Sequence, residues 1–278
     1  MQSPSMKTIP LLDGNCGFDG FYKEAIKSGS DVGLKNITLD EAVGSSHDVV
    51  VLTDRYAGYV DKIKADKKIL WLMEPPSVDP HIYTFASQRN AEFFKVFTFA
   101  KDLVNKFSNF VYSPWGTSFI DVDDQRLYSK SKNISIVASY KQTLEGHQLR
   151  HQVIEKYRDK FDGIKQGKKS SDDYKLIWQQ EYRYSVAIEN SRINGYFTEK
   201  IIDCFRTGVM PIYWGDPAIL DIFNPDGVII FNNAEELEDI LSHANEEVYN
   251  SKLEAVKENY YIAAKYLDPH AHLIESFR

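Results

Sequence analysis

The residues with the clearest chemical meaning lie where a short apolar run gives way to a helix. Ile188 ends the apolar run, and Thr198 is a typical N-cap for a helix over residues 199–207. Because a helix N-terminus presents unpaired N–H groups and a partial positive charge, it attracts anions. Lys200 lies in the first turn, where a cation opposes the helix dipole unless an anion such as a diphosphate is held between them. The same residues also fit a solvated lysine on a helix surface, and both interpretations stay open at this point.

Three stretches around this helix form a specific pattern: Glu189-Asn190-Ser191, Gly195-Tyr196-Phe197-Thr198-Glu199-Lys200-Ile201-Ile202-Asp203 and Gly208-Val209-Met210-Pro211-Ile212-Tyr213-Trp214-Gly215-Asp216-Pro217. Together they resemble the C-terminal signature of the glycosyltransferase family 10 α-1,3/4-fucosyltransferases, over residues 182–231, with weaker similarity back to about Leu70. The resemblance implies the two-domain GT-B fold and a GDP-fucose donor bound largely by the C-terminal domain. It also implies inversion at the anomeric carbon.

The same resemblance assigns residues to the donor site. Glu199 and Lys200 match a pair that contacts the donor, the lysine near the pyrophosphate and the glutamate near the sugar or the ribose. Asn190 and Tyr196 match further positions of the donor pocket, and Arg150 matches an arginine that neutralises the diphosphate. Two fixed cations make chemical sense, because a departing GDP gains negative charge in the transition state. With these two cations, we expect no metal ion to be required.

A candidate base lies in the first half of the chain. An inverting transfer needs a group that takes the proton of the acceptor hydroxyl while the anomeric carbon becomes oxocarbenium-like. Glu74 directly follows the apolar run 69–73 and precedes Pro75 and Pro76, which make a rigid turn. The family carries a glutamate at the end of a comparable strand, although the prolines depart from its usual context. Asp54, after the preceding strand, is the second candidate, and a merely solvated glutamate is the alternative.

Other patterns that can bind metals or phosphates are weaker. Asp121-Val122-Asp123 has two carboxylates at a chelating spacing, but the pattern is short and lies in a polar connection. His147 and His151 lie on one expected helix without a recognisable third ligand, so we expect a solvated pair near the phosphate site. The glycine-rich patch 14–20 lacks the spacing of a phosphate-binding loop, and Cys204 lies among the apolar residues of a helix core.

Short apolar runs alternate with helix-compatible segments along most of the chain. In the first half we expect strands at 47–52, 68–73 and 95–99, and helices at 79–90 and 102–107. In the second half we expect strands at 134–138, 185–188, 209–214 and 227–231, helices at 146–161, 199–207, 235–241 and 246–266, and an exposed loop at 162–173. This alternation is typical of βαβ units with a parallel sheet. Because it occurs twice, we expect two Rossmann-like α/β domains that face each other across a cleft.

Composition indicates where the two domains meet. Residues 121–133 are polar and unpatterned, which suits a connection between domains. We therefore expect an acceptor-side domain over residues 1–125 and a donor-binding domain over residues 126–278, the latter ending in helices. The acceptor is expected to be an oligosaccharide. Two alternatives stay open: a donor that is a different nucleotide sugar, and an inactive module that has kept only glycan or nucleotide binding.

Charge and composition argue against other classes of protein. The chain has 33 basic and 40 acidic side chains and a net charge of −7, so we expect no nucleic-acid partner. No apolar run approaches the ~20 residues that span a bilayer. Residues 1–7 lack the pattern of a secretion signal, and Cys16 and Cys204 alone cannot form a disulfide framework. We expect a cytoplasmic enzyme of bacterial or viral type without a membrane anchor.

Overall fold

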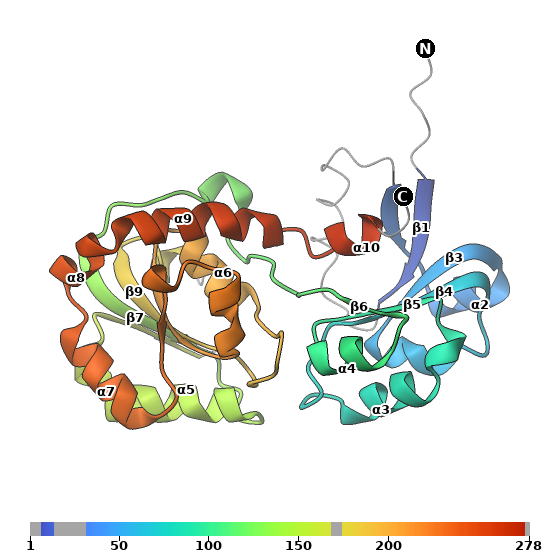
Figure 1. Ribbon diagram of the computed structural model, residues 1–278, viewed down its shortest axis with the longest axis horizontal. Coiled ribbons are helices and arrows are strands. Elements are labelled where there is room, and N and C mark those ends of the chain that lie inside the picture. The colour runs from blue at the N-terminus through green and yellow to red at the C-terminus, as the bar shows by residue number, and fades with distance from the viewer. Residues whose placement is uncertain (1–6, 14–31, 168–173, 276–278) are drawn as a thin grey trace, which may run out of the picture. The chain divides into compact units, whose positions relative to one another are not determined.

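The computed structural model describes residues 7–13, 32–167 and 174–275 (Figure 1). The glycine-rich patch at residues 14–20, which includes Cys16, lies outside these ranges. The chain divides into two compact units, one formed by Met1–Pro114 with Asp268–Arg278 and the other by Trp115–Leu267. The expected domain bounds, 1–125 and 126–278, stay a prediction, because compactness alone does not define folding domains.

Within the described part of the first unit, six parallel strands form one sheet in the order β2-β1-β3-β4-β5-β6. The strands are β1 (Lys7–Leu12), β2 (Val32–Asn36), β3 (Ser46–Thr53), β4 (Lys64–Leu72), β5 (Lys95–Thr98) and β6 (Phe110–Tyr112). The helices of this unit are α2 (Leu39–Gly44), α3 (Pro80–Gln88), α4 (Lys101–Lys106) and α10 (Ala271–Glu275), with short 3-10 turns η2 (Asp54–Tyr59) and η3 (Asn90–Glu92). The last four residues of β3 and of β4 are buried, so the apolar runs that predicted these strands form the centre of the sheet.

The second unit contains a sheet of five parallel strands, again counted over its described residues, in the order β11-β10-β9-β7-β8. These are β7 (Lys132–Ala138), β8 (Gly163–Gln166), β9 (Tyr182–Ile188), β10 (Met210–Trp214) and β11 (Ile229–Ile230). The helices are α5 (Glu145–Lys156), α6 (Glu199–Arg206), α7 (Ala234–His243), α8 (Glu246–Ser251) and α9 (Leu253–Ala263). The 3-10 turns are η4 (Val122–Asp124), η5 (Arg158–Lys160), η6 (Lys175–Trp178), η7 (Pro217–Asp221), η8 (Pro225–Gly227) and η9 (Ala264–Tyr266). Two parallel α/β sheets confirm the expected fold class.

Helices cover both faces of the second sheet, and each face has its own core. Tyr184, Val186 and Ile188 of β9 pack in one cluster with residues of α5 and α7, whereas Ala187 packs in the other with α6. All seven residues of β9 are buried. A strand that is covered on both sides is held at a defined height and register. The residues that follow β9 therefore start from a rigid position.

Several expected elements differ from those observed. The expected loop at 162–173 contains β8, which pairs with β7 at the sheet edge, and β1, β2 and β6 are strands that were not predicted. The expected single helix at 246–266 is three pieces, α8, α9 and η9. Tyr249 of α8 is buried and donates its hydroxyl to Gly208 O at 2.6 Å, while α9 packs along α6. The break lets each helix bury its own apolar side.

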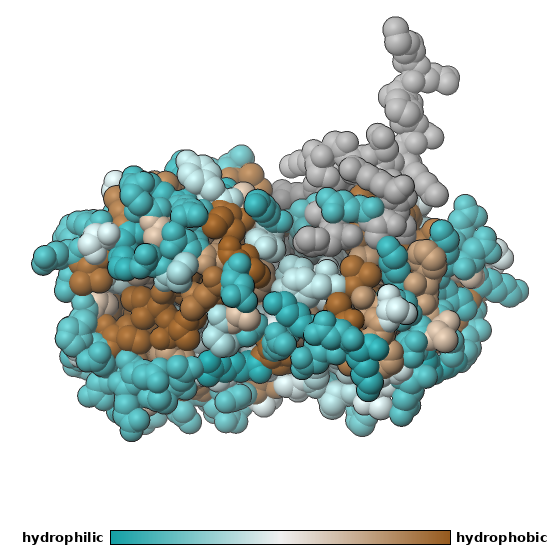
Figure 2. All heavy atoms as spheres, viewed as in Figure 1, coloured by the Kyte–Doolittle hydropathy of each residue, from teal (hydrophilic) through white to brown (hydrophobic). Residues whose placement is uncertain are grey.

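Hydrophilic side chains cover much of the surface that is visible in Figure 2. Figure 2 shows hydrophilic side chains along α5 and α7, with an apolar area between these helices and α9. Among the residues that the structure describes, no helix combines the length and the apolar character needed to cross a membrane.

Candidate active site

The candidate site lies at the carboxyl edge of the second sheet. β9 ends at Ile188 and β10 ends at Trp214, and these two residues are register partners at that edge. α5 begins at Glu145 after β7, and α6 begins at Glu199 after β9. Helices that follow parallel strands present their unpaired N–H groups at this same edge, where anions bind.

Arg150 extends from α5 to the end of β9 and is only 6% exposed. Its Nε donates to Ile188 O at 3.0 Å, and its Nη2 donates to the same carbonyl and to Asn190 Oδ1, the latter at 3.0 Å. Burial lowers the pKa of Arg150, although the carboxylates of Glu189 and Glu199 counteract this. Since an arginine keeps its charge in proteins, a buried cation stands beside Asn190.

Glu199 and Lys200 form an ion pair in the first turn of α6, with 2.9 Å between Lys200 Nζ and Glu199 Oε1. Lys200 Nζ also donates to Thr198 Oγ1 at 3.0 Å and lies 3.5 Å from Glu189 Oε2. Only 18% of the lysine side chain is exposed, so the interpretation as a solvated surface lysine is wrong. Burial raises the pKa of Glu199, but the charges of Lys200 and Lys175 outweigh it and lower the pKa to about 2. Glu199 is therefore an ionised, acceptor-only group at any ordinary pH.

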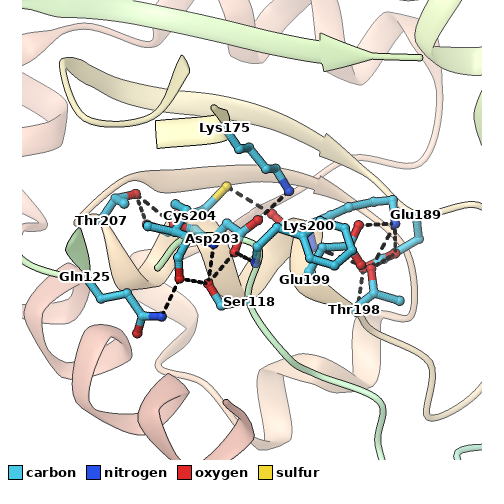
Figure 3. Close-up of polar contacts among 12 residues, drawn as sticks. Ser118, Gln125, Lys175, Glu189, Thr198, Glu199, Lys200, Asp203, Cys204 and Thr207 are labelled. Atoms are coloured by element: carbon cyan, nitrogen blue, oxygen red, sulfur yellow. Dashed lines mark hydrogen bonds and ion pairs between the residues drawn. The ribbon is translucent and has the colours of Figure 1, made fainter. Parts of the chain in front are cut away.

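Glu189 organises the start of α6, a role that its place in the sequence did not indicate. It is fully buried directly after β9, and its carboxylate accepts from Thr198 N–H at 2.9 Å and from the Thr198 hydroxyl at 2.7 Å (Figure 3). The Tyr213 hydroxyl donates to it at 3.4 Å. Thr198 in turn accepts from Lys200 N–H as the N-cap. The orientation of the first helical turn thus depends on a buried carboxylate, which the sequence signals only as an acidic residue ending an apolar strand.

The loop between β9 and α6 holds Asn190 and Tyr196. Gly195 takes a φ of +90°, which residues with side chains rarely adopt, and donates its N–H to Asp216 Oδ2 at 2.6 Å. Tyr196 is 3% exposed and interacts electrostatically with Arg150. The structure therefore brings all of the expected donor-binding residues into one cluster, the donor cluster: Arg150, Asn190, Tyr196, Glu199 and Lys200. Their binding role stays a prediction.

His147 belongs beside the donor cluster, and the expectation of a solvated histidine is wrong. It is 6% exposed, and its Nδ1 accepts from Leu144 N–H at 3.3 Å, so Nε2 carries the proton of the neutral ring. Burial and the nearby charges of Arg150, Lys141 and Lys200 lower the pKa of His147 to about 4. His151, its expected companion, has its Nδ1 2.9 Å from Gln166 Nε2.

The neutral state of His147 predicts a pH dependence of stability. The ring takes up a proton near 6.5 when its environment is ordinary and near 4 in the folded protein. The unfolded chain therefore binds more protons in this window, and the free energy of unfolding falls as pH drops through it, then levels off below it. Urea unfolding at several pH values should show a smaller acid-side loss in His147→Gln than in the unmodified protein. His243→Gln, at an exposed position of α7, is the control, and equal pH profiles for all three proteins would contradict the prediction.

Gly146 allows α5 to approach the end of β9. Its N–H donates to Asn190 O at 3.1 Å, and a Cβ added there would stand 1.7 Å from Glu189 O. Because backbone atoms must move to accept it, we expect Gly146→Ala to lower the free energy of unfolding by roughly 1–3 kcal/mol and to weaken nucleotide binding through displaced Arg150. Gly58→Ala, where the added Cβ meets nothing within 4 Å, is the control. Wild-type stability and affinity in Gly146→Ala would refute this account of the close approach.

Glu74 lies in the first unit, two residues after the end of β4, and its backbone is held on both sides. Its N–H donates to Asp54 Oδ1 at 3.4 Å, next to the 2.9 Å bond from Met73 N–H, and its carbonyl accepts from the Tyr83 hydroxyl at 2.7 Å. Asp54 is 3% exposed and has a φ of +38°, so its carboxylate serves the backbone of this turn. These contacts favour Glu74 over Asp54 as the base, which remains a prediction.

The other expected patterns can be placed as well. Over residues 7–13, 32–167 and 174–275, no group of three or more His, Cys, Asp or Glu side chains is arranged to hold a metal ion. Asp121 and Asp124 are tied to Tyr174, whose hydroxyl accepts from Asp121 N–H at 2.7 Å and donates to Asp124 Oδ2 at 3.1 Å. Cys204 is buried in α6, and burial raises the pKa of its thiol to about 12, as fits a core cysteine.

Comparison with known structures defines the class of protein. A crystal structure of an α1,3-fucosyltransferase with GDP has a TM-score of 0.61 at 16% identity, and the match covers 99% of this chain and 92% of that one. A T4 phage BGT mutant in complex with UDP-glucose has a TM-score of 0.56 at 13% identity, over 98% of each chain. At these identities the matches show the fold alone, and the fold is that of the GT-B glycosyltransferases.

Sequence comparison then gives the family. Residues 127–269, more than half of the chain, match the glycosyltransferase family 10 (fucosyltransferase) C-terminal region, so the chain belongs to this family. An α-(1,3)-fucosyltransferase, FucT, of Helicobacter pylori is 34% identical over 82 residues, 28% of this chain and 17% of that protein. The α-(1,3)-fucosyltransferase B of Drosophila melanogaster is 34% identical over 79 residues, 28% of this chain and 18% of that one. The aligned segments thus span less than a fifth of these curated relatives. The family match confirms the resemblance seen in the sequence.

Proposed function

We propose that this chain transfers fucose from GDP-fucose to a hydroxyl group of an oligosaccharide acceptor, with inversion at the anomeric carbon. The observation that carries the proposal is the donor cluster itself, which lies at the carboxyl edge of a sheet inside the segment that matches family 10. Relatives and solved structures named as fucosyltransferases, one of them with GDP-fucose, support the choice of donor.

The chemistry of the cluster suits a nucleoside diphosphate leaving group. Arg150 and Lys200 bring two cations to the N-terminal ends of α5 and α6, which add the partial positive charge of their dipoles. As the bond between fucose and GDP breaks, charge builds on the phosphates, and fixed cations stabilise that state more than the ground state. The ionised Glu199 can accept hydrogen bonds from hydroxyl groups of the ribose or the sugar.

The reaction also needs a base, for which Glu74 is the proposed group. The acceptor hydroxyl attacks the anomeric carbon from the face opposite the leaving diphosphate, and its proton passes to the carboxylate. A base must be held in place to act, and the backbone of Glu74 is fixed by Asp54 and Tyr83.

Calorimetric titration with GDP, UDP, GDP-fucose and UDP-glucose, followed by an assay of fucose transfer to oligosaccharides, tests the proposal. We expect GDP and GDP-fucose to bind at least about tenfold more tightly than the uridine compounds, which corresponds to ~1.4 kcal/mol, and GDP to be released during transfer. Preferential binding of UDP would mean that the donor is a different nucleotide sugar. Tight GDP binding without transfer to any acceptor would mean that the chain is an inactive binding module.

A further inference from the structure

A buried ion pair lies on α6, one helical turn after Glu199 of the donor cluster. Asp203 of α6 is fully buried, and its Oδ2 is 2.5 Å from Lys175 Nζ of η6. Its Oδ1 accepts from the Ser118 hydroxyl at 2.6 Å and from Phe119 N–H at 2.9 Å. Lys175 is 17% exposed, and its Nζ lies 5.6 Å from the centre of the Phe119 ring. The ammonium is therefore largely withdrawn from water, between Asp203 of α6 and the ring of Phe119.

Lys175 interacts with a second carboxylate, that of Glu199, besides Asp203. Glu199 and Asp203 are four residues apart on α6, so they share a face of the helix, where like charges repel (Figure 3). Glu199 is 12% exposed and interacts electrostatically with Lys175 as well as with Lys200. Burial lowers the pKa of Lys175, but Asp203 and Glu199 outweigh it and raise the pKa. One buried cation thus offsets the charge of both carboxylates, although burial still raises the pKa of Asp203.

Glu199 also interacts with cations other than Lys175. Lys200 pairs with Glu199 and also lies near Glu189, so this lysine is shared between two carboxylates. Arg150 of α5 is a further cation that Glu199 influences. A diphosphate that binds at α6 has to compete with Glu199 and Glu189 for the Lys200 ammonium. That competition weakens if Glu199 has a second counter-ion.

We propose that Lys175 is a positioning residue: it acts as the inner counter-ion of Glu199, so that Lys200 can turn its charge to the donor's diphosphate. The inference rests on the proposed function for the identity of the ligand. For the role of Lys175 it rests on the pair between Lys175 and Asp203 and on the place of Glu199 one turn before Asp203 on α6. It goes beyond the donor cluster, because Lys175 is not one of its residues and acts through Glu199.

Two variants break the same ion pair in opposite ways. Lys175→Met removes the cation that Glu199 and Asp203 share. Asp203→Asn removes one of the two carboxylates, so that Lys175 then interacts with Glu199 and no longer with Asp203. We expect Lys175→Met to lower the affinity for GDP at least about tenfold at about pH 8 and to make this loss smaller toward about pH 5, because the pKa of Glu199 rises toward its usual range and a protonated Glu199 no longer competes for Lys200. Asp203→Asn should keep the GDP affinity within about threefold of wild type with a flat pH profile. Lys175→Arg should restore most of the affinity.

If the ion pair had a purely structural role, both variants would lose GDP affinity to the same extent. Equal losses of GDP affinity in Lys175→Met and Asp203→Asn, in proportion to their losses of stability, would overturn the proposal. If Lys175→Met does not fold, the double variant Lys175→Met/Asp203→Asn, compared with Asp203→Asn, removes Lys175 without leaving a buried carboxylate unpaired. The same difference in affinity and pH profile is expected from that comparison.

Direct titration of Glu199 separates this proposal from the proposed function. The carboxyl ¹³C signal of Glu199, assigned by comparison with Glu199→Gln, reports its pKa without any ligand. We expect that pKa to rise by at least about one unit in Lys175→Met and not in Asp203→Asn. An unchanged pKa in Lys175→Met would overturn the role of Lys175. A wild-type protein that fails to bind GDP would instead refute the proposed function, and the ¹³C titration would still decide about Lys175.

Discussion

Glu74→Gln should abolish most fucose transfer and leave GDP binding intact. The amide keeps the size and the hydrogen-bonded backbone of the glutamate but cannot take the proton of the acceptor hydroxyl. A general base contributes typically 10²–10⁴-fold to the rate, so we expect kcat to fall by about that factor with Kd for GDP unchanged. The measurement is steady-state transfer at saturating donor, together with calorimetric titration of GDP.

A matched control for this variant is Glu92→Gln in η3, a glutamate of the same unit that pairs with Arg89. We expect it to transfer fucose at the wild-type rate. If Glu74→Gln also transfers at that rate, Glu74 has no part in the proton transfer. A loss confined to Asp54→Asn would then point to Asp54, although its carboxylate accepts the N–H groups of Met73 and Glu74.

Lys200→Ala should weaken GDP binding by roughly 1.5–3 kcal/mol, the value of a charge-assisted contact. The structure gives a reason to expect the upper part of this range. Removing the ammonium leaves Glu199 and the fully buried Glu189 without their shared cation, so that two carboxylates then face the incoming phosphates. The measurement is calorimetric titration with GDP at low and at moderate ionic strength.

Lys156→Ala provides the comparison, since this lysine of α5 is 54% exposed and pairs with Glu238. An exposed pair of this kind contributes ~0–1 kcal/mol to stability, so we expect neither stability nor GDP affinity to change much. Equal affinity of Lys200→Ala and wild type would show that the ammonium serves only Glu199, Glu189 and Thr198. In that case Arg150 alone would provide the side-chain cation of the proposed clamp.

The sequence predicts the local structure of α6 closely. Thr198 is the N-cap, the helix runs from Glu199 to Arg206, and Gly208 just past its end takes a φ of +71°. These signals are local, because a cap, an apolar stripe and a terminal glycine act within a few residues. Strand β10 and residues 185–188 of β9 were predictable for a similar reason, as short apolar runs fit strands covered on both faces, whereas the first three residues of β9, which include Arg183, were not predicted.

The contacts that organise the site were beyond such reasoning. Glu189 and Asp203 are charged residues in fully buried places, and their donors come from distant parts of the chain: Tyr213 for Glu189, and Ser118 and Lys175 for Asp203. From sequence alone, a charged residue is expected to be solvated, because a buried partner cannot be identified. For the same reason, His147 was expected to be solvated, and the segment that forms the edge strand β8 was expected to be a polar loop.

A crystal structure with GDP tests most directly whether the diphosphate of the donor binds between α5 and α6. We predict phosphate oxygens within hydrogen-bonding distance of Arg150 and Lys200, with Glu199 turned to a hydroxyl of the ribose. A nucleotide whose phosphates lie away from both cations would contradict the account.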